Sequence, residues 1–459
     1  MPKISDGAVK ARPFRAIERA DLDALPQLAA LPADRRLAMR AVAEVLPFRS
    51  NEYVVDHLID WSRVPDDPIF QLTFPQPGML DPADLARMLD LLRAGAPREA
   101  LRAAARSIHE RLNPHPAGQR QLNVPRLDEV PAIGLQHKYR ETVLFFPRAG
   151  QTCHAYCTYC FRWPLFVGHD DLALAAQEAS ILPRYLRRHP EVRSVLLTGG
   201  DPLIMRSAVL RRLIEPLLAP ELAHVTSIRI GSKSPAYWPH RFVHDRDADD
   251  LLRLFEEIQA AGRHLALMAH YSHPRELSTP VAEAAVRRIR GTGALIRCQA
   301  PVIRHVNDDA DAWAALWQRE VALGAVPYYM FVERDTGPKR YFEVPLARAH
   351  AIFRGAYQRL SGLGRTVRGP SMSATPGKVV IDGVAEIAGE EVFALRFLQA
   401  RDPAWVGRPF HARFDPRATW LDQLRPAFGA PSFFFEDDAG ASRRRRHLPV
   451  VAATRAERP

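Results

Sequence analysis

Short apolar runs alternate with helix-length amphipathic segments from about residue 140 onward, and this pattern dominates the middle of the chain. Six runs have the length and composition of buried strands. They are residues 143–146, 194–198, 225–230, 265–270, 295–303 and 326–331. The segments between them, such as LLRLFEEIQAAG, carry apolar residues at helical spacing. Strands that alternate with helices predict an α/β fold, here a partial (β/α)6 barrel with functional loops after its strands.

The flanking segments have different patterns. Residues 15–45 and 82–112 are predicted as helices, and a proline-rich connector follows the second. After the barrel the sequence becomes rich in strand-forming residues. We therefore expect a helical N-terminal extension with its connector over residues 1–136, the barrel over 137–345, and a small C-terminal element with a basic tail over 346–459.

The chain is basic, with 63 Lys and Arg against 52 Asp and Glu and a net charge of +11 among 459 residues. A basic field attracts polyanions such as nucleic acid or anionic lipid. However, Arg443–Arg446 supply four of these charges in the tail, and no basic strand with interleaved aromatic residues accompanies them. We therefore expect a solvated basic surface rather than a nucleic-acid interface.

Cysteine usage and the N-terminus bear on the compartment. Four cysteines, three of them crowded together, cannot form the disulfide framework of a secreted protein. The first residues contain no apolar signal region, and no run of eighteen apolar residues occurs. We expect a cytoplasmic protein without a membrane span.

Three of the cysteines, Cys153, Cys157 and Cys160, follow the first predicted strand at the spacing C-x3-C-x2-C in QTCHAYCTYCFRW. A structural zinc site needs four ligands, and His154 lies inside the loop rather than at a usual zinc spacing. Thiolates also hold iron–sulfur clusters, normally four at a time. Three thiolates on a four-iron cluster leave one iron open, which favours a catalytic cluster that binds a substrate or co-substrate.

This loop resembles that of the radical S-adenosylmethionine (SAM) superfamily, in which SAM binds the open iron of a [4Fe-4S] cluster. The second strand ends in LLTGGDPLI, and its Gly199, Gly200 and Asp201 are similar to the superfamily's turn that contacts the SAM amino group. A glycine pair after a strand is equally consistent with a tight strand-to-helix connection.

Within that superfamily, residues 40–385 resemble the lysine 2,3-aminomutase family. The similar segments occur in the same order: LPFRSNEYVVDHLIDW, HKYRETVLFF, VTSIRIGSKSPAYWPHR, AHYSHPREL, QAPVIRHVND and VPYYMF. The resemblance implies an isomerase that uses pyridoxal 5′-phosphate (PLP) besides the cluster and SAM. Such an aminomutase moves the amino group of an L-α-amino acid to give a β-amino acid by a radical 1,2-shift.

The resemblance also assigns roles to individual residues. Arg162 corresponds to the arginine that grips the substrate carboxylate, for which a guanidinium fork is well suited. Lys138 and Tyr139 correspond to a cation and an aromatic ring that pack against PLP. In the resemblance, His270 and Gln299 fall at strand ends that face the cofactors, whereas either residue taken alone is more often a hydrogen-bonded core residue.

Lys378, in SMSATPGKVV, aligns with the family's PLP lysine, which lies in a glycine-rich loop after the barrel. Burial of such a lysine favours the neutral amine that a Schiff base requires. Only Pro376 and Gly377 precede Lys378 here, where the family has a proline and a run of glycines. The shorter segment leaves two readings, PLP bound to Lys378 or PLP lost.

The substrate pocket also departs from the family. Lysine-specific members place two aspartates near the distal ammonium of the substrate. The first position is Arg334 here, followed by Asp335, and the second falls near Ala374 or Thr375. A cation there repels an ammonium and attracts a carboxylate, which predicts an acidic or polar amino acid rather than lysine. A shift of one residue would restore Asp335 as a partner for lysine.

Three alternatives remain beside a PLP-dependent aminomutase. One is a radical SAM enzyme without PLP that abstracts hydrogen from another substrate, and the others are an iron–sulfur electron carrier and a nucleic-acid-binding protein. As partners we expect an amino acid substrate and a reductant for the cluster, without a membrane or nucleic acid, and a homo-oligomer is left open.

Overall fold

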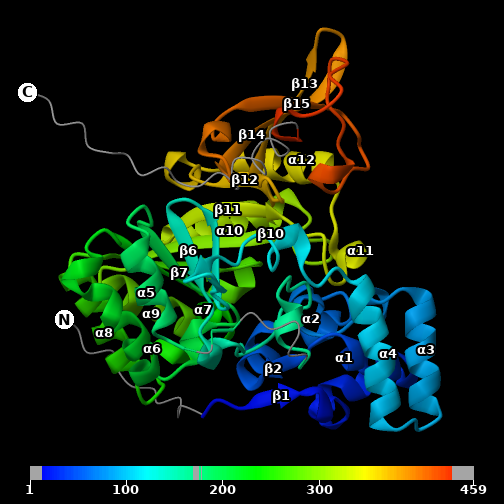
Figure 1. The fold of residues 1–459 in the computed structure, drawn as a ribbon. Helices are drawn as coiled ribbons and strands as arrows, with labels where there is room; N and C mark the ends of the chain where they lie inside the picture. The colour runs from blue at the N-terminus through cyan, green and yellow to red at the C-terminus, as the bar shows by residue number, and fades with distance from the viewer. Residues whose placement is uncertain (1–12, 169–174, 177, 437–459) are drawn as a thin grey trace, which may run out of the picture.

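The computed structural model describes residues 13–168, 175–176 and 178–436 (Figure 1). The predicted basic tail, Arg443–Arg446, lies outside the described residues. No helix in the described part of the chain is long and apolar enough to cross a membrane.

The main sheet has eleven strands in the order β15-β14-β13-β12-β11-β10-β9-β8-β7-β6-β5. Its centre is formed by the six predicted strands, which are parallel neighbours in chain order. They are β6 (Thr142–Phe145), β7 (Ser194–Leu197), β8 (Ser227–Ser232), β9 (His264–His270), β10 (Leu295–Val302) and β11 (Val326–Val332). The mixed α/β class and all six strands are therefore confirmed.

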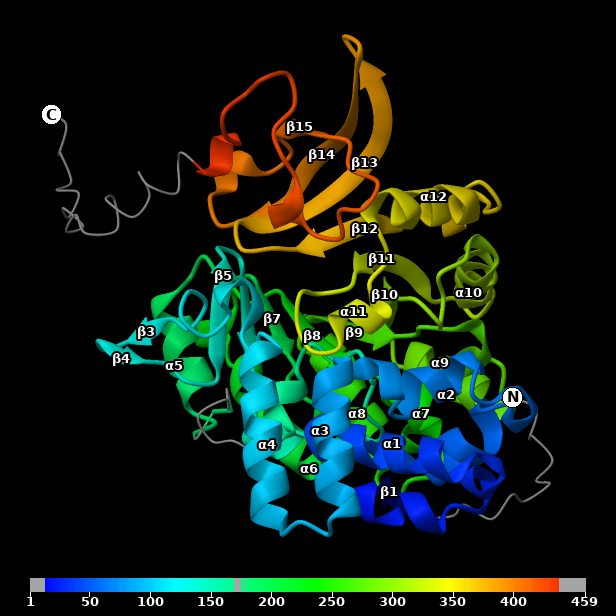
Figure 2. The same ribbon diagram turned by 90° about the vertical axis from the view of Figure 1, so that its right-hand side faces the viewer.

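The sheet extends further than predicted on both sides. On one side, β12 (Arg368–Ser373) adds a parallel strand, and β13 (Gly377–Ile387), β14 (Glu390–Ala400) and β15 (Pro409–Arg413) continue it in antiparallel fashion. On the other side, β5 (Leu135–Tyr139) pairs antiparallel with β6. The C-terminal strands, orange in Figures 1 and 2, thus belong to the same hydrogen-bonded sheet as the cysteine loop's strand.

The sheet is strongly curved. Lys138, on the edge strand β5, donates a hydrogen bond from its Nζ to the carbonyl oxygen of Ala374, which lies between β12 and β13. Strands seven places apart in the sheet can approach in this way only if the sheet bends around an interior. Among the described residues, β5 forms no ladder with β13 or β14, so side chains rather than strand pairing join the two sides.

Helices between the strands cover the outer face of the sheet. They include α5 (Ile181–Arg188), α6 (Ser207–Ile214), α8 (Ala248–Ala260), α9 (Pro280–Gly291), α10 (Ala310–Ala322) and α12 (Leu346–Tyr357), with the short α7 (Ser234–Tyr237) and α11 (Lys339–Phe342). In α8, Leu251, Leu254, Phe255 and Ile258 are completely buried at helical spacing. The apolar faces therefore pack on the sheet, and the polar strand positions that remain face the interior.

The prediction of one helix over residues 15–45 is wrong. The segment begins with β1 (Ala16–Glu18) and two 3-10 turns, and α1 covers only Ala33–Val45. Proline cannot donate the backbone hydrogen bond that a helix interior needs, so Pro26 and Pro32 stand at the starts of separate helical pieces. β1 pairs with β2 (Arg49–Asn51), and α2 (Pro68–Thr73) follows.

The predicted helix over residues 82–112 is two helices, α3 (Pro82–Arg93) and α4 (Arg98–Arg111). Gly95 has a φ of 61°, which ends α3, and Pro97 caps the start of α4. The two helices pack side by side in both views (Figures 1 and 2). The connector that follows contains the small ribbon of β3 (Arg126–Leu127) and β4 (Val130–Pro131).

Candidate functional site

The three clustered cysteines lie on the loop between β6 and α5, and all three are free thiols. Burial raises the pKa of each thiol, to about 12 for Cys160, and the charges of neighbouring cysteines raise the pKa of Cys160 and of Cys153 further. A bound metal would supply the positive charge that such buried thiolates lack.

Among the described residues, no three His, Cys, Asp or Glu side chains converge on one point at which a metal ion could sit. His154 is instead hydrogen-bonded through Nδ1 to the Ser234 hydroxyl at 3.0 Å. The role of Cys153, Cys157 and Cys160 as ligands of a cluster stays a prediction.

The glycine turn after β7 packs directly on the cysteine loop. A Cβ atom on Gly200 would lie 2.4 Å from the backbone nitrogen of Thr152, and Gly199 has a φ of 128°. The next residue, Asp201, donates its backbone N–H to the Thr152 carbonyl at 2.7 Å. Glycine is therefore required here for the approach of two loops. Contact of Gly199 and Gly200 with SAM stays a prediction.

Asp201 connects the loops after β7 and β8. Its buried carboxylate accepts hydrogen bonds from the hydroxyls of Ser232 and Ser234 at 2.9 Å, and from the backbone N–H groups of Leu203, Lys233 and Ser234 at 3.0, 2.8 and 2.9 Å. Burial raises the pKa of Asp201, and these donors oppose that effect. Because both oxygens are engaged, Asp201 fixes the backbone around Lys233, and its predicted contact with a cofactor stays a prediction.

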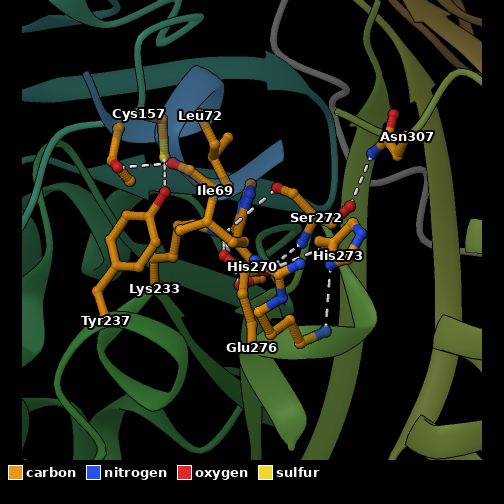
Figure 3. A network of polar contacts seen from close by, with 12 residues as sticks. Ile69, Leu72, Cys157, Lys233, Tyr237, His270, Ser272, His273, Glu276 and Asn307 are labelled. Atoms are coloured by element: carbon orange, nitrogen blue, oxygen red, sulfur yellow. Dashed lines mark hydrogen bonds and ion pairs between the residues drawn. The ribbon is translucent and has the colours of Figure 1, made fainter. Parts of the chain in front are cut away.

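A buried ion pair beside the cysteines was not predicted from the sequence (Figure 3). Lys233 Nζ lies 2.7 Å from the carboxylate of Glu276, and the two side chains are 9% and 0% exposed. Lys233 also lies 4.5 Å from the centre of the Tyr237 ring, whose hydroxyl is 3.4 Å from Cys157 Sγ. The positive charge of Lys233 lowers the pKa of Cys157, against the larger effect of burial. The pair therefore places a cation where a thiolate would form.

His270 and Gln299 are brought together as cross-strand partners on β9 and β10. The side-chain nitrogen of Gln299 lies 2.7 Å from His270 Nε2. Burial lowers the pKa of His270 to about 3, so the ring is neutral and can accept the amide hydrogen. At least one polar group of each residue is thus satisfied within the protein, and their contact with cofactors stays a prediction.

Arg162 and Arg334 contact the same aromatic ring. The guanidinium carbon of each lies 4.8 Å from the centre of the Phe161 ring, and that of Arg162 also lies 4.4 Å from Phe146. Burial lowers the pKa of Arg162 to about 9, and the charge of Arg334 adds to this effect. Neither arginine forms an ion pair among the described residues, and Arg162 Nη1 and Arg334 Nε are buried without a hydrogen-bond partner there.

Asp335, the residue after Arg334, is held by the side chain of Asn113. Its carbonyl and carboxylate oxygens lie 2.6 and 3.3 Å from the Asn113 side-chain nitrogen, close to the end of α4. The charge of Asp335 nevertheless raises the pKa of Arg334, against the larger effect of burial. The structure therefore leaves Arg334 as the cation of this segment, with Asp335 as its neighbour.

Lys378 lies on β13 rather than in a loop, so the loop placement implied by the family does not hold. Its Nζ is 4.0 Å from the centre of the Tyr329 ring and 5.2 Å from that of Phe331. Burial lowers the pKa of Lys378 to about 7, and the charges of Arg368, Arg229 and Arg334 lower it further. The amine is therefore close to neutral at physiological pH.

Lys138 and Tyr139 lie in the same interior as Lys378. Burial lowers the pKa of Lys138 well below its usual range, and the charges of Arg401, Arg334 and Lys378 contribute. Lys138 Nζ also lies 5.4 Å from the centre of the Tyr139 ring. The curved sheet thus gathers the predicted PLP residues from its two opposite sides.

The overall sequence was compared with known proteins. No family model matches the chain. It is 32% identical over 399 residues to a protein of Aquifex aeolicus named "Putative L-lysine 2,3-aminomutase", and this match covers 85% of the chain and 91% of the relative. The chain belongs to the lysine 2,3-aminomutase family. The resemblance described above is thereby confirmed, and with the cysteine loop it implies an enzyme with a [4Fe-4S] cluster and SAM.

Two further lysine 2,3-aminomutase family matches are shorter. The L-lysine 2,3-aminomutase of Fusobacterium nucleatum is 29% identical in a match that covers 51% of the chain, and that of Clostridium subterminale is 28% identical in a match that covers 50%. Each match covers 52% of the relative. Two solved structures, a radical SAM methyltransferase of Sphaerobacter thermophilus and SuiB of Streptococcus suis, align with 63% and 62% of the chain and cover 94% and 60% of those proteins. Their sequence identities are 15% and 13%, and their TM-scores are 0.35 and 0.37. Superpositions as loose as these add nothing to the family assignment.

Proposed function

We propose that the chain is a PLP-dependent radical SAM aminomutase that converts an L-α-amino acid into a β-amino acid. One observation carries the proposal beyond family membership. Lys378 is a half-buried lysine with a pKa of about 7, and its Nζ lies against the Tyr329 ring in the curved sheet that also carries the cysteine loop. A neutral amine is the form that reacts with the aldehyde of PLP.

Different residues would hold the iron–sulfur cluster and PLP. Cys153, Cys157 and Cys160 supply three thiolates, which leaves one iron of a four-iron cluster for SAM. When bound and reduced by an external partner, the cluster and SAM supply a radical that removes hydrogen from the substrate. The protein itself positions the groups and excludes water, and Lys378 and the cysteines approach the interior from different parts of the sheet.

We further propose that the substrate is an acidic amino acid. Arg162 and Arg334 lie at the same distance from the Phe161 ring, and neither has a carboxylate partner among the described residues. The charges of Asp335 and Glu333 act on Arg334 without forming an ion pair with it. A substrate with two carboxylates would give both arginines a direct partner. The distal ammonium of lysine would instead meet a like charge.

The proposal is tested with anaerobically reconstituted protein. The wild type, Lys378→Ala and a matched Lys339→Ala control are incubated with PLP, and any adduct is trapped with borohydride and located by mass spectrometry. We expect an adduct on Lys378 in the wild type and in the control, and none on that site in Lys378→Ala. SAM cleavage and β-amino acid formation are then assayed with glutamate, aspartate and lysine.

SAM cleavage without any PLP adduct would contradict the proposal and support a radical SAM enzyme without PLP. The replacement of the expected glycine run by Pro376 and Gly377 gives that alternative a specific basis. A Cβ on Gly377 would lie 2.3 Å from the carbonyl oxygen of Gln399, so the pairing of β13 with β14 already explains this glycine.

A further inference from the structure

Two half-buried arginines of the curved sheet near Lys378, Arg229 and Arg368, have no assigned role. Arg368, the first residue of β12, has its guanidinium carbon 4.1 and 4.2 Å from the centres of the Tyr328 and Tyr329 rings. Lys378 lies over the same Tyr329 ring at 4.0 Å. Arg229 comes from β8, and its pKa is lowered by burial and by the charge of Arg368. We call Arg229, Arg368 and Lys378 the interior cations.

The interior cations meet across the hollow of the sheet rather than along its surface. β8 is separated from β12 by three strands, β9, β10 and β11. Neighbouring strands are about 4.8 Å apart, so residues at these positions would be well separated on a flat sheet. The hydrogen bond from Lys138 to Ala374 shows that the sheet curves, and Arg368 and Lys378 both contact the Tyr329 ring. The charge of Arg229 lowers the pKa of Lys378, in agreement with side chains that project into the same interior.

The interior cations lack ion-pair partners in the part of the chain that the structure describes. Arg229 Nε and Arg368 Nη2 are buried without a hydrogen-bond partner there, and the one hydrogen bond of the Arg229 guanidinium is a long one of 3.4 Å to the Thr142 hydroxyl. Like charges held together in a partly dry interior repel one another strongly unless an anion joins them.

We propose that Arg229 and Arg368 bind the phosphate group of PLP, with Lys378 on its aldehyde carbon. The inference rests on the proposed PLP dependence. The aldehyde and the phosphate arm occupy adjacent positions on the pyridine ring, so an amine at the aldehyde brings the phosphate close to it. Lys378 and Arg368 both contact the Tyr329 ring, so they lie as close together as the aldehyde and the phosphate arm require. The lysine and the aldehyde condense with loss of one water, and the phosphate takes no covalent part.

The phosphate contribution is measured by comparing PLP with pyridoxal, which has the aldehyde but no phosphate. Both ligands are titrated against the reconstituted full-length wild type, Arg229→Gln, Arg368→Gln and a control, Arg253→Gln, and the adduct is trapped with borohydride. Arg253 is a suitable control because it is exposed on α8 and forms an ion pair with Asp250. Inorganic phosphate is added as a competitor in a second series.

Loss of one charged hydrogen-bonding partner is expected to weaken PLP binding roughly 10- to 100-fold in Arg229→Gln and Arg368→Gln. The comparison is made at pH 9.5, because loss of Arg368 also raises the pKa of Lys378 and would weaken both adducts at neutral pH. At pH 9.5, pyridoxal binding should be unchanged in all variants, and Arg253→Gln should bind both ligands as the wild type does. Inorganic phosphate should compete with PLP in the wild type and lose this effect in the two variants. Arg368→Lys, which keeps the charge, should recover part of the affinity and shows that loss in Arg368→Gln is not misfolding.

Equal weakening of PLP and pyridoxal, or no weakening of either, would overturn the phosphate assignment while the adduct on Lys378 still supports the proposed function. Absence of an adduct with both ligands in the wild type would overturn both. Competition by inorganic phosphate that persists in both glutamine variants would place phosphate elsewhere and also count against the assignment.

Discussion

The reaction of Lys378 with PLP is expected to depend on pH in a way that an ordinary lysine cannot reproduce. With a pKa of about 7 rather than 10.5, Lys378 is about half neutral at pH 7, whereas an unperturbed lysine is neutral in about one molecule in 3,000. Only the neutral amine attacks an aldehyde. The rate of adduct formation should rise about tenfold per pH unit below pH 7 and level off above pH 8.

The rate is measured between pH 5.5 and 9.5 by mixing PLP with the protein and trapping the adduct with borohydride at timed intervals, since the iron–sulfur cluster absorbs where the adduct does. Arg368 is the largest charged contributor to the shift, so in Arg368→Gln the pKa of Lys378 should rise and the plateau should move to higher pH. Burial is the first cause and remains, so the pKa should stay below 10.5. A rate that still rises tenfold per unit at pH 9.5 in the wild type would refute the reasoning.

The lowered pKa of Lys378 also affects the free energy of unfolding. Between about pH 7 and 10.5 the folded chain holds Lys378 neutral while the unfolded chain binds a proton, so the contribution of Lys378 to the free energy of unfolding rises with pH across that window. The destabilisation caused by burying the charged form of Lys378 is fully present below pH 7 and absent above pH 10.5.

Three other substitutions have defined outcomes. Gly200→Ala places a Cβ 2.4 Å from the Thr152 backbone nitrogen, so the cysteine loop must move, and iron content per chain after reconstitution should fall; unchanged iron content would contradict this. Glu276→Gln leaves Lys233 buried without its counter-charge and should cost about 3 kcal/mol, seen as a lower thermal unfolding temperature, whereas an unchanged temperature would count against the pair. Arg334→Asp should shift substrate preference from glutamate toward lysine, and an unaltered ratio of the two rates would argue against a role in specificity.

The features that the sequence predicted well are those with local signals. Each of the six central strands is a short apolar run whose length and flanks distinguish it from a helix, and the cysteine loop is a contiguous motif. The helix boundaries in the N-terminal third failed where Pro32 and Gly95 divide segments whose apolar spacing is otherwise continuous.

Long-range features had no such signal. Lys233 and Glu276 are 43 positions apart, and nothing in GSKSPAY or SHPREL marks them as partners before the fold brings their loops together. Arg229 was indistinguishable from an ordinary strand residue for the same reason, since its neighbours lie on strands that adjoin only through sheet curvature. Burial in the interior, rather than local propensity, gives these residues their chemistry.

The continuity of the main sheet has a consequence for how the chain can be divided. β12 is hydrogen-bonded to β11, and β13 supplies both Lys378 and one wall of the interior. Cleavage after β11 would therefore uncover a long row of unpaired backbone groups at a buried parallel edge, which invites aggregation. The C-terminal strands are thus no detachable accessory: any shortened version, circular permutation or fusion intended to retain the iron–sulfur half must keep them in place.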